Sequence, residues 1–429
     1  MKNFLKKVVV KILTWEAKQL IKRHRPIIIG VTGSVGKTTT KDAIYQAIKN
    51  SLAARKSEKS FNSEIGVPVT VLGLKNGWNN PLLWAKNIID GFFVALFSKE
   101  YPAVLVLEMG IDRPGDMERL TSWITPDLVV LTRLPSVPVH VEYFGTAQAV
   151  VEEKMKLAGA LKAEGTFIYN HDDEIIQSKL GEILPRSIGF GRYVPTDYTG
   201  SDDRSVYYDD RLVGTTFSIS HDNQSASLTL KGTLGTQQVY ACTAAVAVAD
   251  VLGIPLIESV AALQELETPT GRMRLIPGIK STMIIDDTYN SSPTACEQAL
   301  LTLGEIKYAG RKIAVLGDML ELGRFSSDEH EKIGALVPKV ADILLTVGVR
   351  SRKIAEVALN NGLPEENILQ YEDSARAGRE LQNLLQAGDV VLVKASQGIR
   401  AEKIVEEIMA QPEQASTLLV RQDTEWAKR

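Results

Sequence analysis

Short apolar runs alternate with segments of helical period along most of this chain. Four continuous apolar runs predict buried strands, because a strand covered on both faces carries few polar residues. These runs lie at residues 26–32, 103–110, 127–132 and 165–170. Since helical segments separate them, we expect parallel strands. Residues 190–234 instead carry short alternating runs rich in Tyr, Thr, Ser, Asp and Gly, which predict antiparallel strands at the edge of the same domain.

A second alternating pattern follows a long helix expected over residues 237–253, which ends at Gly253. The stretch "ETPTGRMRLIPG" (267–278) is rich in Pro and Gly and is interpreted as a linker, with a hinge near 268–271. After it, the runs "TMIIDD", "KIAVLGDM", "DILLTVG" and "DVVLVKAS" predict a second α/β domain. The expected units are residues 1–25, 26–268 and 269–412, with a weakly patterned tail at 413–429.

Residues 1–25 carry apolar side chains at near-helical spacing, with lysines between them. They hold eight Lys or Arg against one acid, Glu16, so their net charge is +7 within a chain of −3. Such a basic amphipathic helix either rests on an anionic membrane surface or packs on the protein with its basic face in solvent, and the sequence leaves both open. The run "LLWAKNIIDGFFVALF" (82–97) contains Lys86 and Asp90 and is interpreted as an amphipathic helix rather than a membrane span.

Length and composition narrow the class of protein. A chain of 429 residues is expected to form two or three domains, and its net charge of −3 indicates no nucleic-acid partner. Two cysteines, Cys242 and Cys296, exclude a disulfide scaffold and a four-cysteine zinc site. With no signal-peptide pattern, we expect a cytoplasmic protein, peripheral to the inner face of the membrane if residues 1–25 bind lipid.

The stretch "IIIGVTGSVGKTTTKDAI" (27–44) predicts a phosphate-binding loop between a buried strand and a helix. Gly36, Lys37 and Thr38 match the P-loop template GxxxxGK[ST], although Val31 stands at its first glycine. Lys37 is expected to reach the terminal phosphates, and the Thr38 hydroxyl to hold Mg²⁺. The predicted nucleotide-binding residues of the loop are Gly33, Ser34, Val35, Gly36, Lys37, Thr38 and Thr39. The expected fold is therefore α/β: a central P-loop domain with a mainly parallel sheet and an antiparallel edge, followed by a smaller Rossmann-like α/β domain.

Further motifs follow the loop in a characteristic order. They are "SFNSEIGVPVTVL" (60–72), "LEMGIDRPGDM" (107–117), "HVEYFG" (140–145), "TGRMRLI", "IIDDTYNSSP" (284–293), "VLGDMLELG" (315–323) and "GDVVLVKASQGI" (388–399). In this order the chain resembles the Mur ligase superfamily over about residues 27–410, and within it the branch that adds D-alanyl-D-alanine to a muramoyl tripeptide. The resemblance implies an ATP-dependent amide ligase of cell-wall peptidoglycan precursor synthesis that forms an acyl phosphate and releases ADP and phosphate.

The resemblance also implies roles for individual residues. The metal ligands, for a site with two Mg²⁺, would be Thr38, Glu108, His140 and Lys154, with Lys154 carbamylated. The catalytic residues would be Lys37, His140 and Lys154. Further contacts to ATP would come from Gln238, Arg272, Asp287 and Asn290, and contacts to the two substrates from Asn62, Glu64, His330, Lys394 and Ser396. For Lys154 the alternative is an exposed helix face, since "EEKMK" has the composition of one and Lys156 stands where relatives commonly carry an acid.

The chain also departs from this family's pattern. Gln237, Gln238 and Ala241 replace residues that relatives use near adenine, and Gln397 replaces an arginine. Only 26 residues precede the loop region, which leaves no room for the family's UDP-binding domain. We therefore expect that other residues bind UDP, that a partner protein binds it, or that the donor substrate is a different one. The alternatives are a Mur-like ligase that joins a different amine to a different, lipid-linked carboxylate, or a non-catalytic nucleotide-binding scaffold. Retention of Lys37 and Glu108 argues against the scaffold.

Overall fold

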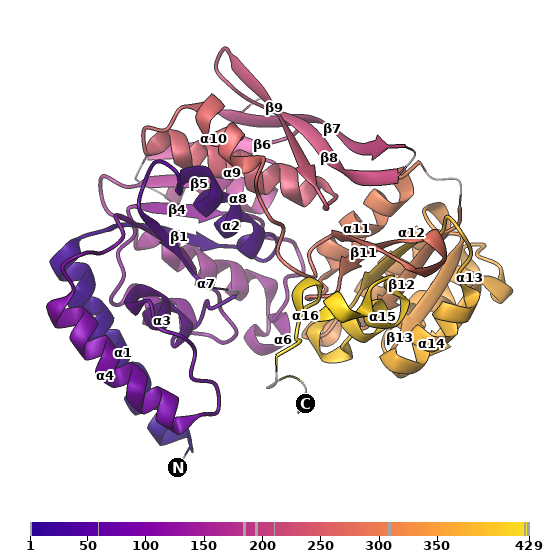
Figure 1. Cartoon of the computed structure of the whole chain (residues 1–429), viewed down its shortest axis with the longest axis horizontal. Helices are drawn as coiled ribbons and strands as arrows, with labels where there is room; N and C mark the ends of the chain where they lie inside the picture. Colours follow the sequence, from indigo (N-terminus) through magenta and orange to yellow (C-terminus); the bar gives the residue numbers. More distant parts are fainter. Residues whose placement is uncertain are drawn as a thin grey trace.

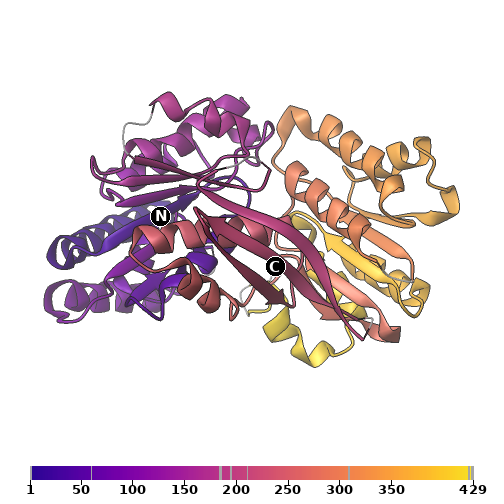
Figure 2. The same ribbon diagram turned by 90° about the horizontal axis from the view of Figure 1, so that it is seen from above.

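The computed structural model describes the chain apart from residues 1, 59, 183–185, 194–195, 210, 308–309, 424–425 and 427–429. Within the described residues, one sheet has nine strands and a second has six. Figures 1 and 2 show the two sheets, each with its helices, as adjoining units. The α/β fold that the sequence predicts, with a larger and a smaller unit, is confirmed.

The first sheet is parallel except at one edge. Its strands, in spatial order, are β2 (Ala54–Lys56), β3 (Val104–Glu108), β1 (Ile27–Thr32), β4 (Leu128–Leu131), β5 (Thr166–Asn170), β6 (Arg186–Gly191), β7 (Tyr198–Tyr208), β8 (Arg211–His221) and β9 (Gln224–Lys231). Pairing is parallel from β2 to β7, and antiparallel between β7, β8 and β9. The predicted antiparallel edge is therefore confirmed, and β6, which the sequence pattern missed, joins it to the parallel part.

Helices cover both faces of this sheet. They are α1 (Lys2–His24), α2 (Lys37–Ile48), α3 (Gly66–Leu72), α4 (Pro81–Phe97), α5 (Asp116–Thr121), α6 (Val141–Phe144), α7 (Ala147–Gly159), α8 (Glu174–Gln177), α9 (Thr236–Val251) and α10 (Leu256–Leu263). Neighbouring strand residues such as Ile28 and Ile29 point to opposite faces, so they belong to different core clusters. Helices α2, α9 and α10 cover the face of Ile29, and α1, α3, α5 and α7 cover the other.

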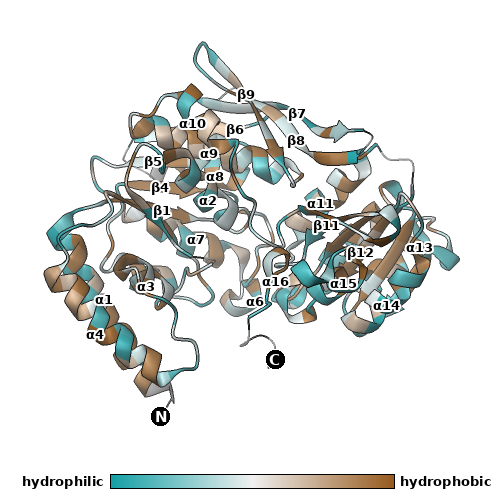
Figure 3. Cartoon of the chain, in the orientation of Figure 1, coloured by the Kyte–Doolittle hydropathy of each residue, from teal (hydrophilic) through white to brown (hydrophobic). Residues whose placement is uncertain are grey.

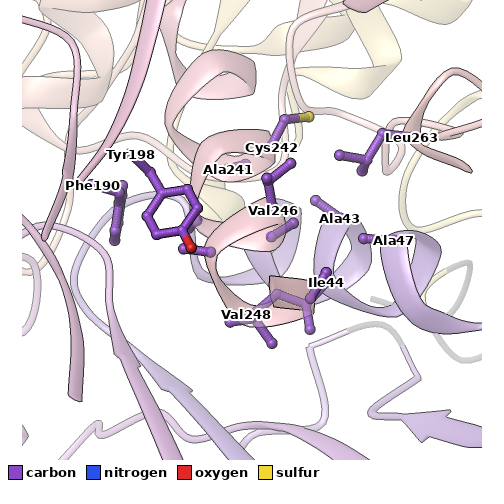
Figure 4. Packing of buried hydrophobic residues seen from close by; sticks show 14 of the residues in the cluster. Ala43, Ile44, Ala47, Phe190, Tyr198, Ala241, Cys242, Val246, Val248 and Leu263 are labelled. Atoms are coloured by element: carbon purple, nitrogen blue, oxygen red, sulfur yellow. The ribbon is translucent and has the colours of Figure 1, made fainter. Parts of the chain in front are cut away.

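Small side chains bring α2 and α9 close together. Ala43 and Ala47 of α2 lie in one core cluster with Ala241 and Cys242 of α9, as Figure 4 shows. Close helix packing of this kind leaves little freedom to either axis. The first residues of α2 and α9, which both face the candidate site described below, are therefore held by the core beneath them.

The second sheet is also covered on both faces. Its strands, in spatial order, are β10 (Arg274–Pro277), β11 (Met283–Asp287), β15 (Val390–Lys394), β12 (Lys312–Gly317), β13 (Ile343–Val347) and β14 (Ile368–Tyr371). Its helices are α11 (Pro293–Glu305), α12 (Ser326–Leu336), α13 (Arg352–Asn360), α14 (Ser374–Leu384), α15 (Glu402–Ile408) and α16 (Ala415–Leu418). Helices α11 to α13 contribute to one core cluster, and α14 to α16 contribute to the other.

Two segments are more ordered than their sequence suggested. Interpreting residues 267–278 as a linker is wrong for its second half, because β10 pairs antiparallel with β11 and buries Ile276. The tail at 413–429 places Leu419 in a core cluster, and its Arg421 donates a hydrogen bond of 2.6 Å to the carbonyl of Thr288. Residues 424–425 and 427–429 of that tail lie outside the described part of the chain.

Helices α1 and α4 pack side by side at one end of the larger unit (Figure 1). Leu13, Ala17 and Leu20 of α1 are fully buried, so α1 packs on the protein, as one of the two interpretations of residues 1–25 predicted. Asn87, Gly91 and Ala95 of α4 are buried, and Trp84, Ile88 and Val94 are partly buried against the same core. The large apolar side chains on the rest of α4 are exposed, namely Leu82, Ile89, Phe92, Phe93, Leu96 and Phe97. The helix predicted there thus forms, with several large apolar side chains in solvent. Figure 3 shows the apolar residues of α4 in brown. No helix among the described residues is both long and apolar enough to cross a membrane.

Glu16 is buried between these two helices and carries the first prediction. It is 1% exposed, and its Oε2 has no hydrogen-bond partner among the described residues. Burial raises the pKa of Glu16 to about 7. Because the pKa is higher in the folded than in the unfolded chain, the contribution of Glu16 to stability is lost as the pH rises from about 4.5 through 7. We expect Glu16→Gln to stabilise the protein by about 1–3 kcal/mol at pH 8.

Thermal unfolding of the Glu16→Gln variant and the wild type at two pH values tests this. The variant should melt at a higher temperature at pH 8 and at nearly the same temperature at pH 5, since Gln and a protonated Glu differ little in polarity. An unchanged or lower melting temperature at pH 8 would contradict the assignment of Glu16 as a destabilising buried carboxylate.

Candidate active site

The phosphate loop is held in place by the end of the neighbouring strand. Gly33 adopts φ +141°, and a Cβ there would lie 2.0 Å from the hydroxyl oxygen of Thr132. That hydroxyl donates a hydrogen bond of 2.7 Å to the carbonyl of Val35, and the Ser34 N–H donates one of 2.7 Å to the carbonyl of Arg133. Gly36, at φ +85°, precedes α2. The loop is thus a fixed turn whose N–H groups lie at a helix N-terminus, the usual setting for bound phosphate.

Two lysines face this loop from different helices. Lys37 is the first residue of α2, and its pKa is lowered mainly by burial, with Glu108 acting in the opposite direction and Arg272 lowering it further. Lys154 of α7 is 2% exposed and donates a hydrogen bond of 3.0 Å to the carbonyl of Gly33. Burial, and then the charge of Lys37, hold the pKa of Lys154 well below its usual range.

The exposed-face interpretation of this part of α7 is therefore wrong for Lys154 and correct for Lys156. The Lys156 ammonium lies at the surface, 2.9 Å from Glu153 and 3.4 Å from Glu118. Helix α7 buries only one of its sides, and Lys154 lies on the buried side. Lys156, two residues further along, points to the opposite side and is therefore exposed.

Glu108 and Thr38 fit the chemistry of a magnesium site. Glu108, the last residue of β3, is 1% exposed; its Oε1 accepts a hydrogen bond of 3.0 Å from Asn62, while its Oε2 finds no partner in the part of the chain described. The Thr38 hydroxyl lies 3.2 Å from that of Ser60, two residues before Asn62. Among the described residues, no group of three or more His, Cys, Asp or Glu side chains could hold a metal. This sparse set suits Mg²⁺, which usually binds one or two carboxylates together with substrate phosphates and water.

His140 lies between the two units. It adopts a left-handed conformation, φ +70°, immediately before α6. Its Nδ1 is 2.6 Å from Oε2 of Glu321 in the smaller unit, and its Nε2 is 3.7 Å from Oδ1 of Asp112. The hydrogen bond from His140 lowers the pKa of Glu321. Asp112 and Glu321 were not predicted as site residues, although both stand inside quoted motifs; Asp112 also acts on the pKa values of Lys37 and Lys154.

The smaller unit brings four of the predicted nucleotide and substrate residues to the phosphate loop. Arg272 stacks on the ring of Tyr289 at 4.1 Å and reaches within 3.5 Å of the Thr38 hydroxyl. Its Nε is buried and unpaired as far as the described chain shows. Asp287 and Lys394 form an ion pair of 2.6 Å, and Lys394 also donates to the carbonyl of Asn290 at 3.0 Å. Arg272, Asp287, Asn290 and Lys394 line one pocket together with Ser34, Val35, Gly36 and Thr39, and we call it the loop pocket.

Gln237 and Gln238 form the far wall of the loop pocket, at the start of α9. The Gln238 side-chain N–H donates a hydrogen bond of 3.0 Å to the Thr233 hydroxyl. The buried Oε1 of Gln238 accepts no hydrogen bond from any described residue. Gln237 donates across the pocket to Gln298 of α11. Ala241 lies in the hydrophobic core and does not line the pocket. The loss of an amide at that position therefore leaves the pocket wall unchanged.

The loop pocket is narrow in this structure. Its volume of about 70 Å³ is well below the range of about 300–1,000 Å³ that is typical of ligand sites. The contact between Gln237 and Gln298 joins the two units across it. A nucleotide is larger than this volume, so we expect the pocket to widen on binding, by movement about the hinge that the sequence predicts near residues 268–271.

A larger cleft of about 820 Å³ adjoins the loop pocket and lies between the two units. We call it the interdomain cleft. Asn290 lines both cavities, and Asn62, Glu64, His140 and Ser396 line the cleft. The sequence analysis missed its basic residues Lys6, Arg113, Arg119 and Arg400. For Arg113 and Arg119, the run of charged residues in "DRPGDMERL" was the sequence signal that could have indicated a binding role.

His330 does not face either cavity, which corrects its predicted contact with substrate. It is fully buried; its Nε2 accepts a hydrogen bond of 3.1 Å from the Met319 N–H, and its Nδ1 donates one of 2.6 Å to the carbonyl of Ser326. Burial lowers its pKa. A neutral histidine with both nitrogens satisfied supports the strand-to-helix loop of the smaller unit and has no nitrogen left for a ligand.

Comparison with protein families and curated proteins gives consistent matches. The family described as the Mur ligase middle domain matches residues 31–84 and 86–249, and the Mur ligase, glutamate ligase domain matches residues 271–397. The UDP-N-acetylmuramoyl-tripeptide–D-alanyl-D-alanine ligase of Bacillus subtilis is 28% identical over 405 residues, which cover 92% of this chain and 79% of that protein. The ligase of the same name from Mycobacterium leprae is 28% identical over 395 residues, covering 87% and 71%.

The fold has solved counterparts. The crystal structure of MurF ligase from Thermotoga maritima in complex with ADP superposes with a TM-score of 0.75 at 26% identity, covering 93% of this chain and 83% of that one. A MurF structure from Acinetobacter baumannii superposes with a TM-score of 0.73 at 22% identity and shares the fold, covering 92% and 79%.

Proposed function

Because this chain belongs to the Mur ligase family and is an ATP-dependent carbon–nitrogen ligase, we propose that it adds D-alanyl-D-alanine to a muramoyl tripeptide during synthesis of the cell-wall precursor. In this reaction a carboxylate oxygen of the tripeptide attacks the γ-phosphorus of ATP and ADP leaves. The amine nitrogen of D-alanyl-D-alanine then attacks the acyl carbon, the phosphate leaves with the C–O electron pair, and the amine gives up a proton.

One observation carries this proposal: the loop pocket and the interdomain cleft meet at Asn290. The phosphate loop lines the first, and three of the predicted substrate residues, Asn62, Glu64 and Ser396, line the second. A nucleotide in the loop pocket would have its phosphates against the loop, where the N–H groups and Lys37 offset their charge. A carboxylate entering from the cleft would approach the same place. The cations Arg272 and Lys394 lower the repulsion between the two anions.

The enzyme uses ATP and Mg²⁺, as Mur ligases do. Thr38 and Glu108 would hold the metal beside the phosphates, and the metal would neutralise charge on the transferred phosphoryl group. The Oε1 of Gln238, which has no partner among the described residues, would accept a hydrogen bond from the amino group of adenine. Asn62 donates to Glu108 and so orients that carboxylate.

We propose that Lys154 carries a carbamate and that His140 joins it at a second Mg²⁺. The lowered pKa of Lys154 supports this, because only an uncharged amine attacks CO2. The Nζ–C bond forms while one C=O bond of CO2 opens to a carboxylate oxygen, a proton leaves Nζ, and the neutral amine becomes an anion. The Lys154 side chain would then repel neither Lys37 nor a metal ion. His140 would exchange its contacts with Glu321 and Asp112 for the metal when the units move.

Phosphate release by the purified protein tests the main reaction. ATP and Mg²⁺ are supplied with UDP-MurNAc-tripeptide, with D-alanyl-D-alanine, and with both. Release that requires both substrates, with the pentapeptide product identified by mass, is the expected result. Release without either substrate, or none with both, would overturn the choice of substrates, and a lipid-linked muropeptide and other amines would be tried next.

We also propose that residues 1–25, together with α4, hold the enzyme against an anionic membrane surface at the inner face. Two observations support it. The exposed side of α1 carries Lys7, Lys11, Lys18 and Lys22. The exposed rings of Phe92, Phe93 and Phe97 pack on one another along α4, with centroids 6.1 and 5.9 Å apart. A row of exposed aromatic side chains beside a basic helix is typical of a protein that lies in the membrane interface.

Co-sedimentation with vesicles containing phosphatidylglycerol tests this attachment. Deletion of α1 is unsuitable because Leu13, Ala17 and Leu20 belong to the core. The double variant Phe93→Ser, Phe97→Ser is expected to lower the bound fraction by roughly tenfold, and added salt should weaken binding of the wild type. Leu359→Ser, an exposed leucine of α13, is the matched control. Equal sedimentation of the wild type and the α4 variant would contradict the proposal.

A further inference from the structure

A groove between α1 and α5 continues the interdomain cleft away from the phosphate loop. We call it the α1–α5 groove; its volume is about 300 Å³, and its walls include Lys11, Trp15 and Lys18 of α1 and Trp123, which follows α5. Glu64 and Arg119 line both the groove and the cleft. The groove therefore adjoins the cleft, and the cleft adjoins the loop pocket at Asn290.

The groove carries positive charge that the protein does not use internally. Glu64 is the acid in its wall, and Lys6, at 3.1 Å, and Arg119, at 3.6 Å, already neutralise it. Neither Lys11 nor Lys18 makes an ion pair with any described residue. Lys11 and Lys18 lie seven residues, about two helical turns, apart on one face of α1, so their uncompensated ammonium groups suit an anionic ligand with more than one negative charge.

The same groove offers an aromatic surface. Trp15 is 48% exposed although it belongs to a helix with a buried side, and Trp123 packs against the core of the larger unit with its edge in the groove. An exposed tryptophan on a packed helix gains nothing from folding alone, and large amphipathic rings of this kind commonly contact ligands. The groove thus combines a dianion site with a flat apolar wall.

We propose that the α1–α5 groove binds the pyrophosphate that links the muramoyl sugar of the donor to its carrier group. This rests on the proposed function, because it needs a donor whose free carboxylate reaches the phosphate loop through the cleft. The peptide of the donor then lies in the cleft, and its activated sugar end lies in the groove. The phosphates contact Lys11 and Lys18, and the carrier group lies against Trp15 and Trp123. The carrier is either a nucleoside or a polyprenyl chain, since both are attached through the same pyrophosphate.

Steady-state kinetics with three donors tests the groove. The donors are UDP-MurNAc-tripeptide, polyprenyl-pyrophosphoryl-MurNAc-tripeptide in detergent, and MurNAc-tripeptide without pyrophosphate. The double variant Lys11→Ala, Lys18→Ala is expected to raise KM for a pyrophosphate donor by roughly tenfold, to leave kcat within about twofold, and to leave KM for MurNAc-tripeptide unchanged. Lys49→Ala, Lys231→Ala removes the same charge from exposed positions outside the groove and outside α1, and should match the wild type.

The donor that responds identifies the carrier, and either response supports the groove. An unchanged KM for both pyrophosphate donors, or an equal rise in the control variant, would overturn it while leaving the ligase reaction intact. If the wild type ligates no donor, the proposed function fails. Calorimetry with UDP-MurNAc-tripeptide and with the polyprenyl donor then tests separately whether the groove binds pyrophosphate. Binding that the Lys11→Ala, Lys18→Ala variant loses would support the site, and binding that it retains, or none by the wild type, would overturn it.

Discussion

Replacing Lys37 by methionine is expected to reduce the ligation rate by about 10³-fold while the protein remains folded. The methionine side chain fills a similar volume, but it removes the ammonium that faces the phosphate loop from the start of α2. Burial and the neighbouring Arg272 lower the pKa of Lys37, and Glu108 and Asp112 favour its charged form. A bound triphosphate would favour that charge further, so its loss falls mainly on the transition state, where negative charge spreads over the transferred phosphoryl group.

The measurement is kcat and KM for ATP, together with a melting curve. Lys49→Met, at the exposed C-terminal end of the same helix, is the matched control and should leave both constants unchanged. A Lys37→Met variant that keeps more than about a tenth of the wild-type rate would show that the loop does not bind the reacting phosphate.

Replacing Lys154 by alanine is expected to lower the rate by about 10²–10³-fold, and short carboxylic acids such as acetate should restore part of it. The rescue is expected because the proposed carbamate supplies an anion, which a small carboxylate in the space left by the side chain can replace. In the wild type, removal of dissolved CO2 should lower activity, and 13C-labelled bicarbonate should give a carbamate signal by NMR. The amine form that reacts becomes more abundant as the pH rises, and the lowered pKa of Lys154 makes it available at a lower pH than for an ordinary lysine.

Lys156→Ala is the control for this experiment, since that side chain lies at the surface and pairs with Glu153 and Glu118. It should keep its activity and its response to CO2. A Lys154→Ala variant that no carboxylate rescues, together with a wild type that takes up no label, would exclude the carbamate. Lys154 would then remain a hydrogen-bond donor to the Gly33 carbonyl.

Several features of this protein could be predicted from the sequence because they depend on residues close together in the chain. The phosphate loop is one: a buried strand, Gly33, Gly36 and the start of α2 lie within a few residues of one another. The parallel strands are another, since continuous apolar runs indicate burial on both faces. The ordered motifs also allowed residues from both units, such as Glu108 and Arg272, to be assigned to one site by family resemblance.

Other features required the tertiary structure, because they depend on which side of an element packs inward. Lys154 and Lys156 have the same local composition, and only the packing of α7 separates a buried amine from a surface ion pair. His330 follows a motif of the site yet points into the core of the smaller unit. The short strand β10 was hidden in a segment rich in Pro and Gly, because its pairing partner β11 supplies the hydrogen bonds that its own residues do not indicate.

The composition of residues 1–25 and 82–97 determined that two helices would form and that one would be basic. It could not determine that α4 would bury Asn87, Gly91 and Ala95 and leave its phenylalanines exposed, because this depends on packing against α1, where a side chain at Gly91 would meet the Glu16 carboxylate. Nor could it show that Glu64 and Arg119 would join a groove on α1 to the interdomain cleft. Hydrophobic pattern is a property of one element, whereas a cavity is formed by several elements far apart in the sequence, and only their packing decides which side chains line it.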